Sequence, residues 1–155
     1  MTLLESLKKS REMWQWLADH PDVRSKWVYF QWANIIREDQ PVNQCYVCDA
    51  VLKSENAYEC EGGCPIEWIK GIDIPYACEG AETKYDEELE DYVEVEHETP
   101  YEVWCSALPE DGEARTKAAL EIVKLHEEAI GRIEDGTYND EDFMASDCMW
   151  SPGDE

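Results

Sequence analysis

The 155-residue sequence predicts a mainly α-helical fold with an irregular, cysteine-rich insertion in its middle, and an α+β fold is the alternative. Apolar residues recur at helical spacing near both ends, glycines and prolines interrupt the middle, and closely spaced cysteines gather there. The chain is 43 % apolar, which is enough for a packed core. Its length predicts one domain over 1–136, followed by an acidic tail over 137–155.

The first part of the domain, 1–37, predicts two helices packed as an antiparallel hairpin. Thr2 and Glu5 fit a capping box, and the apolar residues that follow them have helical spacing to about residue 19. Pro21 and Asp22 end this helix and start a second one, which we expect to run to about Arg37. The second helix has a wide apolar face, so we expect it to be largely buried, with an aromatic ligand platform as the alternative. The residues expected in this core are Trp14, Trp16, Trp27, Val28, Phe30, Trp32, Ile35 and Ile36.

The irregular segment that follows, 38–78, contains cysteines at the spacing of a metal site. Four thiolates about 2.3 Å from one ion complete the tetrahedron that Zn²⁺ prefers. The sequence therefore predicts a structural zinc knuckle in which Cys78 is the alternative to Cys60. The ligands expected from the pattern C-x2-C-x11-C-x3-C are Cys45, Cys48, Cys60 and Cys64.

The cysteine count also indicates a compartment and a role for the metal. Seven cysteines is an odd number, the N-terminus does not resemble a signal peptide, and no apolar stretch approaches the ~20 residues of a membrane span. We therefore expect reduced thiols in a cytoplasm, with zinc rather than disulfides. A site closed by four thiolates has no open coordination position, so zinc is not expected to take part in catalysis.

The net charge of −24 at pH 7 is concentrated beyond the N-terminal hairpin. The balance is +2 over 1–37 and −26 over 38–155, and the segment 79–102 contains eleven acidic residues and one lysine. Such a field repels nucleic acid and membrane surfaces and attracts basic proteins. The alternating run YVEVE predicts a short strand at 92–96. The residues expected to bind a partner are Asp86, Glu87, Glu88, Glu90, Asp91, Tyr92, Glu94 and Glu96.

A long C-terminal helix is predicted over 109–134. Apolar residues form a stripe along this range, and Gly136 stands where a C-terminal cap belongs. Three scattered histidines and no phosphate loop or nucleophile motif give no catalytic constellation, so we expect a protein that is not an enzyme. The residues of the helical stripe are Ala119, Ile122, Val123, His126, Ile130 and Ile133.

The order of motifs resembles small acidic zinc-binding accessory proteins of bacteriophages, a group without an assigned function. The resemblance covers most of 10–130, although the C-x3-C spacing and the long acidic segment before Tyr101 depart from the pattern. It implies an accessory protein that acts in the cytoplasm of a bacterial host and has no enzyme activity. The motifs that carry it are Trp14-Gln-Trp16-Leu17, Cys45/Cys48, Cys64-Pro65 with Trp68, Cys78, Tyr101-Glu-Val-Trp104 and the last helix.

Two hypotheses for function follow. In the first, the protein is zinc-stabilised, and its acidic surface binds and inhibits a basic host protein that handles nucleic acid or serves in defence. DNA mimicry is one form of this hypothesis, because carboxylates can occupy a groove that otherwise binds phosphates. In the alternative, the protein is a metal-stabilised structural or assembly protein that recognises partners through its tryptophan-rich helices, and its charge serves solubility only.

Overall fold

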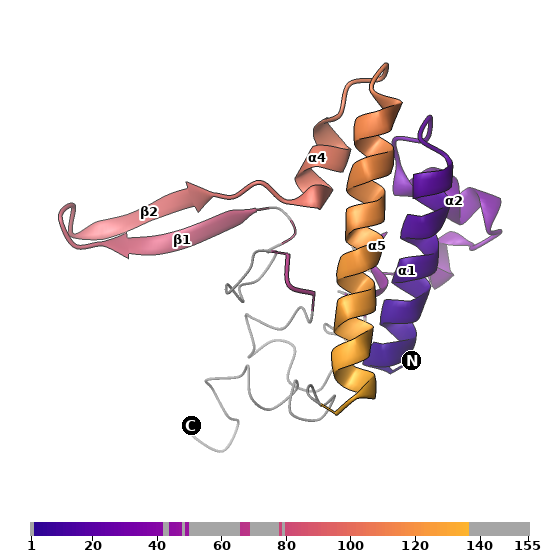
Figure 1. Ribbon diagram of the computed structural model, residues 1–155, viewed down its shortest axis with the longest axis horizontal. Helices are drawn as coiled ribbons and strands as arrows, with labels where there is room; N and C mark the ends of the chain where they lie inside the picture. Colours follow the sequence, from indigo (N-terminus) through magenta and orange to yellow (C-terminus); the bar gives the residue numbers. More distant parts are fainter. Residues whose placement is uncertain are drawn as a thin grey trace.

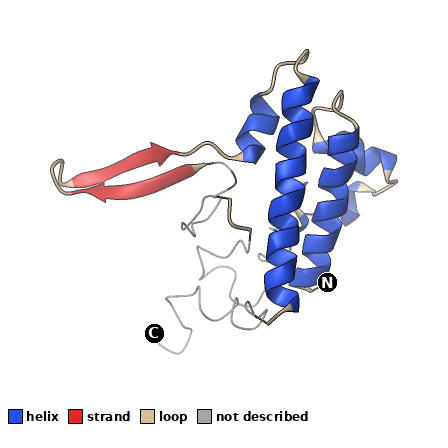
Figure 2. Cartoon of the chain, in the orientation of Figure 1, coloured by secondary structure: helices blue, strands red, loops and turns tan. Residues whose placement is uncertain are grey.

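The computed structural model describes residues 2–41, 44–47, 49, 66–68, 78 and 80–136. Within these residues the chain forms four α-helices, one 3-10 turn and one two-stranded antiparallel sheet (Figure 1). Helix dominates, as Figure 2 shows, and the prediction of a mainly helical fold is confirmed. The elements are α1 (Leu3–Asp19), α2 (Lys26–Trp32), η1 (Arg37–Asp39), β1 (Ala81–Asp86), β2 (Asp91–Glu96), α4 (Pro100–Ser106) and α5 (Gly112–Glu134).

Helices α1 and α5 lie side by side and antiparallel, and they form the body of the molecule (Figure 1). The contacts between them run in opposite order along the two helices. The Thr116 hydroxyl donates to the carbonyl of Ala18 at 3.4 Å, near the end of α1 and the start of α5. Near the other end, Lys8 forms an exposed ion pair with Glu134 at 3.4 Å. The long C-terminal helix therefore packs along the whole N-terminal helix.

The start of α1 and the end of α5 agree with the sequence prediction. The Thr2 hydroxyl accepts from the backbone N–H of Glu5 at 3.1 Å, and the Glu5 carboxylate accepts from the N–H of Thr2 at 3.0 Å. This capping box satisfies two backbone donors that the first turn of α1 would otherwise leave without acceptors. Beyond the end of α5, Gly136 has a positive φ of 82° and its N–H donates to the carbonyl of Ile133. Only glycine adopts this left-handed conformation without steric strain.

The core consists of two clusters of buried side chains, and Trp68 packs against both. The first cluster joins α1, α2, α4 and the first half of α5, and it contains Trp14, Phe30 and Trp104. The second cluster joins the start of α1 to the last turns of α5 and to the segment around Val47. Trp68 therefore ties its segment of the chain to both parts of the helical body.

The second helix differs from the prediction, because α2 ends at Trp32 instead of continuing to about Arg37. The chain turns at Asn34, whose φ of +58° is left-handed and cannot continue an α-helix. With only seven residues, α2 directs few side chains inward, and α5 already covers α1. The expected burial of four apolar residues is therefore wrong: the exposed fractions are 40 % for Trp27, 39 % for Val28, 62 % for Trp32 and 59 % for Ile36.

Strands β1 and β2 form a hairpin that extends away from the helices (Figure 1). The register pairs Tyr85 with Tyr92 and Asp86 with Asp91, and residues 87–90 make the connecting turn. The strand predicted at 92–96 is confirmed, and its partner strand is new. At the base of the hairpin, the N–H of His97 donates to the carbonyl of Gly80 at 2.6 Å. No helix within the described residues is long and apolar enough to cross a membrane.

Candidate functional site

The β1–β2 hairpin contains all eight residues that the sequence predicts to bind a partner. Seven of them are exposed and Asp86 is half-buried. Asp86 differs because its Oδ1 accepts from the backbone N–H groups of Glu88 at 2.9 Å and Leu89 at 3.2 Å. This carboxylate holds the turn, a local role that aspartate often takes. Asp91 Oδ1 accepts from the N–H of Tyr92 at 2.8 Å, and the glutamates of the group are exposed to solvent or to a partner.

The register of the hairpin places its aromatic residues and two of its acids on one face. Residues that stand opposite each other in an antiparallel pair share a face, as do residues two apart along a strand. Tyr85 and Tyr92 are opposite each other, and their rings contact edge to face with centroids 5.3 Å apart. Both rings are more than half exposed, at 54 % and 68 %. Glu94 and Glu96 follow Tyr92 on the same face, which thus combines an aromatic pair with a row of carboxylates.

The thiols of the predicted zinc site are only partly within the described residues. Cys45 and Cys78 are described and half-buried, whereas Cys48, Cys60 and Cys64 lie outside the described residues. Among the described side chains, no group of three or more histidine, cysteine, aspartate or glutamate residues could hold a metal ion. The four-thiolate zinc site stays a prediction, and so does the structure of the tail 137–155.

Sequence spacing gives no sign of a second feature, a half-buried tyrosine, Tyr101, that is influenced by cysteines from other segments. Burial raises the pKa of the Tyr101 phenol, and so do the charge of Cys105, a hydrogen bond with Cys105, and the charges of Cys78 and Cys45. The Tyr101 ring also contacts Trp14 edge to face at 5.9 Å. Three thiols from three segments of the chain thus lie within electrostatic range of one phenol.

Lys26 completes this cluster from the first residue of α2. Its side chain is buried, and its Nζ lies 4.7 Å from the centre of the Tyr101 ring and 5.5 Å from the centre of the Trp14 ring. An ammonium over an aromatic face is attracted by the negative charge of the π system. Sequence spacing gave no signal for this contact, because it needs α2 and α4 to pack into the same core cluster as α1.

The buried side chain of His126, on α5, is hydrogen-bonded to α1. The Nδ1 of His126 lies 2.7 Å from the carbonyl of Ile122, and its Nε2 lies 2.7 Å from the Ser10 hydroxyl. Burial lowers the pKa of His126 to about 4, with smaller contributions from the positive charges of Lys26 and Arg11. Both ring nitrogens are hydrogen-bonded and the side chain is inaccessible, so His126 serves the core and not a reaction.

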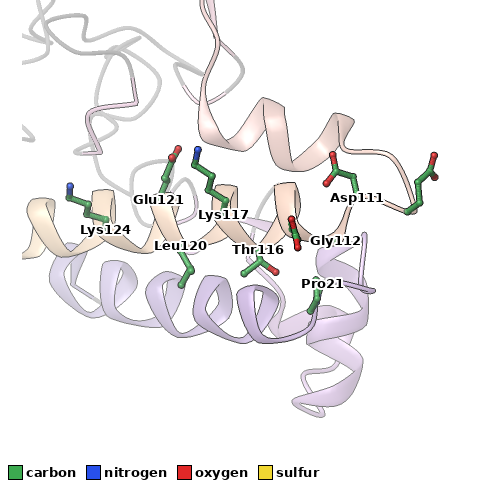
Figure 3. A pocket seen from close by; sticks show the side chains of 10 residues that line it. Pro21, Asp111, Gly112, Thr116, Lys117, Leu120, Glu121 and Lys124 are labelled. Carbon is green, nitrogen blue, oxygen red and sulfur yellow. The ribbon is translucent and has the colours of Figure 1, made fainter.

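A surface groove beside α5 does not resemble a catalytic site. It is an open groove of about 910 Å³ along the first half of α5, with Pro21 at one end (Figure 3). Its charged residues have both signs, and Lys117 and Glu121 point in the same direction, away from α1 (Figure 3). Thr116 is the one hydroxyl among its lining residues, and this hydroxyl donates to a backbone carbonyl of α1.

Comparison with protein-family models, with curated proteins and with solved structures finds no match for this chain. Function is therefore inferred from the charge, exposure and packing of this chain's own residues.

Proposed function

We propose that this protein is a zinc-stabilised, non-enzymatic accessory protein of bacteriophage type, and that the β1–β2 hairpin is the arm with which it binds a basic protein. The observation that carries the proposal is the shape of the arm: it extends from the helical body and exposes seven of the eight predicted residues. The favoured partner is a host protein that handles nucleic acid in the bacterial cytoplasm, because such a protein has a positively charged surface that fits this arm.

The arm combines the two features that a charged interface needs. Exposed carboxylates steer a positively charged surface toward the arm and release its bound counterions, as the phosphates of DNA do. Tyr85 and Tyr92 supply a rigid aromatic anchor, which is the type of residue that dominates binding energy at the centre of interfaces. An arm that fills a nucleic-acid groove in this way would inhibit its partner by DNA mimicry. The same charge disfavours direct binding of this protein to nucleic acid.

The proposal is tested by neutralising the arm without changing its shape. A partner captured from bacterial lysate is first identified by mass spectrometry, and its affinity is then measured by calorimetry at about 0.1 M and 0.5 M salt, a range over which exposed charges become strongly screened. The arm variant replaces Glu87, Glu88, Glu90, Glu94 and Glu96 by glutamine. We expect it to bind at least tenfold more weakly at low salt and to lose most of the salt dependence.

A matched control separates the arm from net charge. Five exposed acidic residues of the α4–α5 region undergo the same change to glutamine, so that both variants have the same net charge. We expect the control to bind within about threefold of the unchanged protein, because its substitutions lie away from the arm. Equal losses in the two variants would show that net charge and not the arm governs binding. The control positions are Glu110, Glu113, Glu121, Glu127 and Glu128.

The apolar surface of α2 supports the second candidate function, recognition through the tryptophan-rich helices. Trp27, Val28, Trp32 and Ile36 are exposed and close together in sequence, and large exposed apolar side chains in a group often mark an interaction site. Under this function, Trp32→Ser weakens partner binding by at least tenfold, the affinity is insensitive to salt, and the arm variant binds normally. The two functions therefore make opposite predictions for the same pair of variants.

A further inference from the structure

Strand β2 is an edge strand in the part of the chain that the structure describes. The hairpin extends away from the helices (Figure 1), and within the described residues its sheet consists of β1 and β2 alone. A strand at the edge of a sheet presents backbone N–H and C=O groups that can pair with another chain. Two-stranded hairpins are also only marginally stable by themselves. The arm therefore has the backbone groups to accept a further strand, and it gains stability by doing so.

The register of the hairpin indicates which backbone groups of β2 face outward. Antiparallel pairs alternate between those that exchange backbone hydrogen bonds and those that do not. The N–H of His97 donates to the carbonyl of Gly80, one step beyond the last pair of the register. Alternation from this bond directs the backbone groups of Val93 and Val95 toward β1. The backbone groups of the residues between and after these valines therefore face outward.

The outward backbone groups belong to Tyr92, Glu94 and Glu96. The N–H of Tyr92 donates to the Oδ1 of Asp91 at 2.8 Å, which agrees with its outward direction. A side-chain contact of this kind protects one end of the edge. The N–H groups of Glu94 and Glu96 face outward with no third strand opposite them among the described residues. These two residues thus form the part of the edge that can pair.

The side chains beside this edge differ between the two faces of the hairpin. Successive residues of a strand point to opposite faces, so the two glutamates lie on one face and Val93 and Val95 lie on the other. The glutamates are exposed. The valines are half-buried, although they lie outside both core clusters. A strand placed along this edge would meet carboxylates on one face and aliphatic side chains on the other.

We propose that the arm binds its basic partner by strand addition, in which an extended segment of that protein pairs antiparallel with the outer edge of β2. The backbone of the segment exchanges hydrogen bonds with Glu94 and Glu96. Its lysine or arginine side chains lie beside these glutamates, and its aliphatic side chains cover Val93 and Val95. The recognised segment therefore alternates basic and aliphatic residues. The inference rests on the acidic arm of the proposed function, and it adds the mode of contact and the sequence pattern of the partner.

Charge favours this occupant over a second copy of the chain. Two β2 strands paired edge to edge would align one row of carboxylates with another, and like charges across a strand pair are destabilising. A basic strand places opposite charges at the same positions, which stabilises the pair. Charged side chains are also a common protection of edge strands against unwanted pairing. The acids of β2 therefore oppose self-association and at the same time admit a basic strand.

Synthetic peptides test the predicted pattern with the full-length protein unchanged. The probe alternates lysine and valine over seven residues and has blocked termini, and the control peptide has the same composition with its valines in one block. Fluorescence anisotropy gives the affinities at about 0.1 M salt, where exposed charges still interact over about 10 Å. We expect the probe to bind at least tenfold more tightly, because only its side chains alternate in step with β2. Equal affinities would show that charge alone attracts both peptides, and would overturn strand addition.

Methylation of single backbone nitrogens in the probe tests the hydrogen bonds themselves. An N-methyl group removes one donor and leaves the side chain and its charge in place. In antiparallel pairing, a lysine opposite Glu94 directs its N–H toward β2, whereas the N–H of the next valine points away. We expect methylation at an inner lysine to weaken binding by at least tenfold, and methylation at the adjacent valine to weaken it by less than threefold. Unless the lysine position is the more sensitive of the two, antiparallel addition is overturned.

Sedimentation of the protein alone tests the other occupant. We expect no dimer that the alternating peptide dissociates. A dimer that this peptide dissociates, and whose formation slows hydrogen exchange at the amides of Glu94 and Glu96, would assign the edge to a second copy and overturn the proposal.

The failure of the proposed function has a different signature. If the arm variant with five glutamines binds the captured partner normally, the acidic arm is not the binding site, and the inference falls with it. If that variant loses the partner while the two peptides bind the unaltered protein equally well, the arm keeps its proposed function and strand addition alone is overturned.

Discussion

At the scale of single residues, His126 shows how a buried imidazole is held in one protonation state. A carbonyl oxygen can only accept, so the Nδ1 that faces Ile122 must carry a proton and donate it. The Nε2 is then the acceptor for the hydroxyl of Ser10, and the ring is neutral. Lys26 and Arg11 add positive charge nearby, which opposes a second proton. Every polar atom of the ring is thereby satisfied inside the core.

This arrangement predicts that acid destabilises the fold through His126. The pKa of His126 is about 4 in the folded protein and 6.5 in the unfolded chain. Between pH 4 and pH 6.5 the unfolded chain therefore binds more protons than the folded protein. Stability from this residue is therefore complete above pH 6.5 and is lost as the pH falls toward 4. Between pH 7 and pH 5 the loss is about 2 kcal/mol, to be measured by urea unfolding. His126→Gln should show a pH dependence smaller by this amount, and an unchanged dependence would contradict the assignment.

Arg115 makes a different prediction, because its buried guanidinium is only half satisfied. Its Nη2 donates to the carbonyls of Leu108 and Pro109 at 2.7 and 3.0 Å, but Nε and Nη1 have no hydrogen-bond partner among the residues that the structure describes. Replacing a poorly paired buried charge with an apolar residue of similar length is often neutral or stabilising. We expect Arg115→Met to change the free energy of unfolding by less than about 1 kcal/mol, and Arg115→Ala to lower it by about 2–4 kcal/mol through the cavity it leaves. Equal large losses in both variants would show that the two carbonyl contacts dominate.

At the scale of elements, the base of the hairpin depends on Gly80. Its φ of +80° is left-handed, and an added Cβ would collide with the carbonyl oxygen of His97. Because backbone would have to move, we expect Gly80→Ala to lower hydrogen-exchange protection in β1 and β2 by at least tenfold while the amides of α5 keep theirs. Gly131→Ala is the control, since its Cβ meets nothing within 4 Å and alanine should stabilise the helix by about 1 kcal/mol. Unchanged protection of the hairpin in Gly80→Ala would contradict this account.

The sequence predicted those elements whose signals are local. The capping box at Thr2, the stripe along 109–134 and the alternation at 92–96 each depend on neighbours within one element, and all three are confirmed. The length of α2 was mispredicted, because apolar spacing continues past Trp32 while the backbone turns at Asn34. Strand β1 was missed, because only pairing with β2 makes it a strand.

The candidate site follows the same rule. Charge density located the acidic arm, since every one of its predicted residues lies in the hairpin or its turn. The cluster of Lys26, Tyr101 and the thiols could not be predicted, because α2, α4 and the segments around Cys45 and Cys78 meet only after packing. A lysine at the start of a helix is ordinarily exposed, and nothing local marks this one as buried.

At the scale of the whole molecule, core and charge occupy different parts of the chain. The buried clusters belong to the helices and to the segments around Val47 and Trp68. None of the hairpin side chains that the structure describes, 84–96, belongs to either cluster, and the hairpin extends away from the body (Figure 1). Mutual repulsion among these acids opposes compactness, so an arm that extends from the body reduces the electrostatic cost to the core.

This separation predicts that the arm can be removed without unfolding the body. The N–H of His97 donates to the carbonyl of Gly80 at 2.6 Å, so the two ends are adjacent and two glycines can replace residues 81–96. The deletion removes eight acidic residues and one lysine, which changes the net charge from −24 to −17. Because none of the deleted side chains that the structure describes belongs to the core, we expect the free energy of unfolding to change by less than about 1 kcal/mol, and lower repulsion to offset part of any loss.

Urea unfolding followed by tryptophan fluorescence measures the stability of the body directly. Apart from Trp68, the described tryptophans lie in the helices, and none of them lies in the arm. Partner binding by the shortened protein gives the second half of the result. A stable body that no longer binds assigns recognition to the arm, and a stable body that binds normally assigns it to the apolar face of α2. A body that loses several kcal/mol would contradict this prediction, because the described side chains of the hairpin make no contribution to the core clusters that hold the helices together.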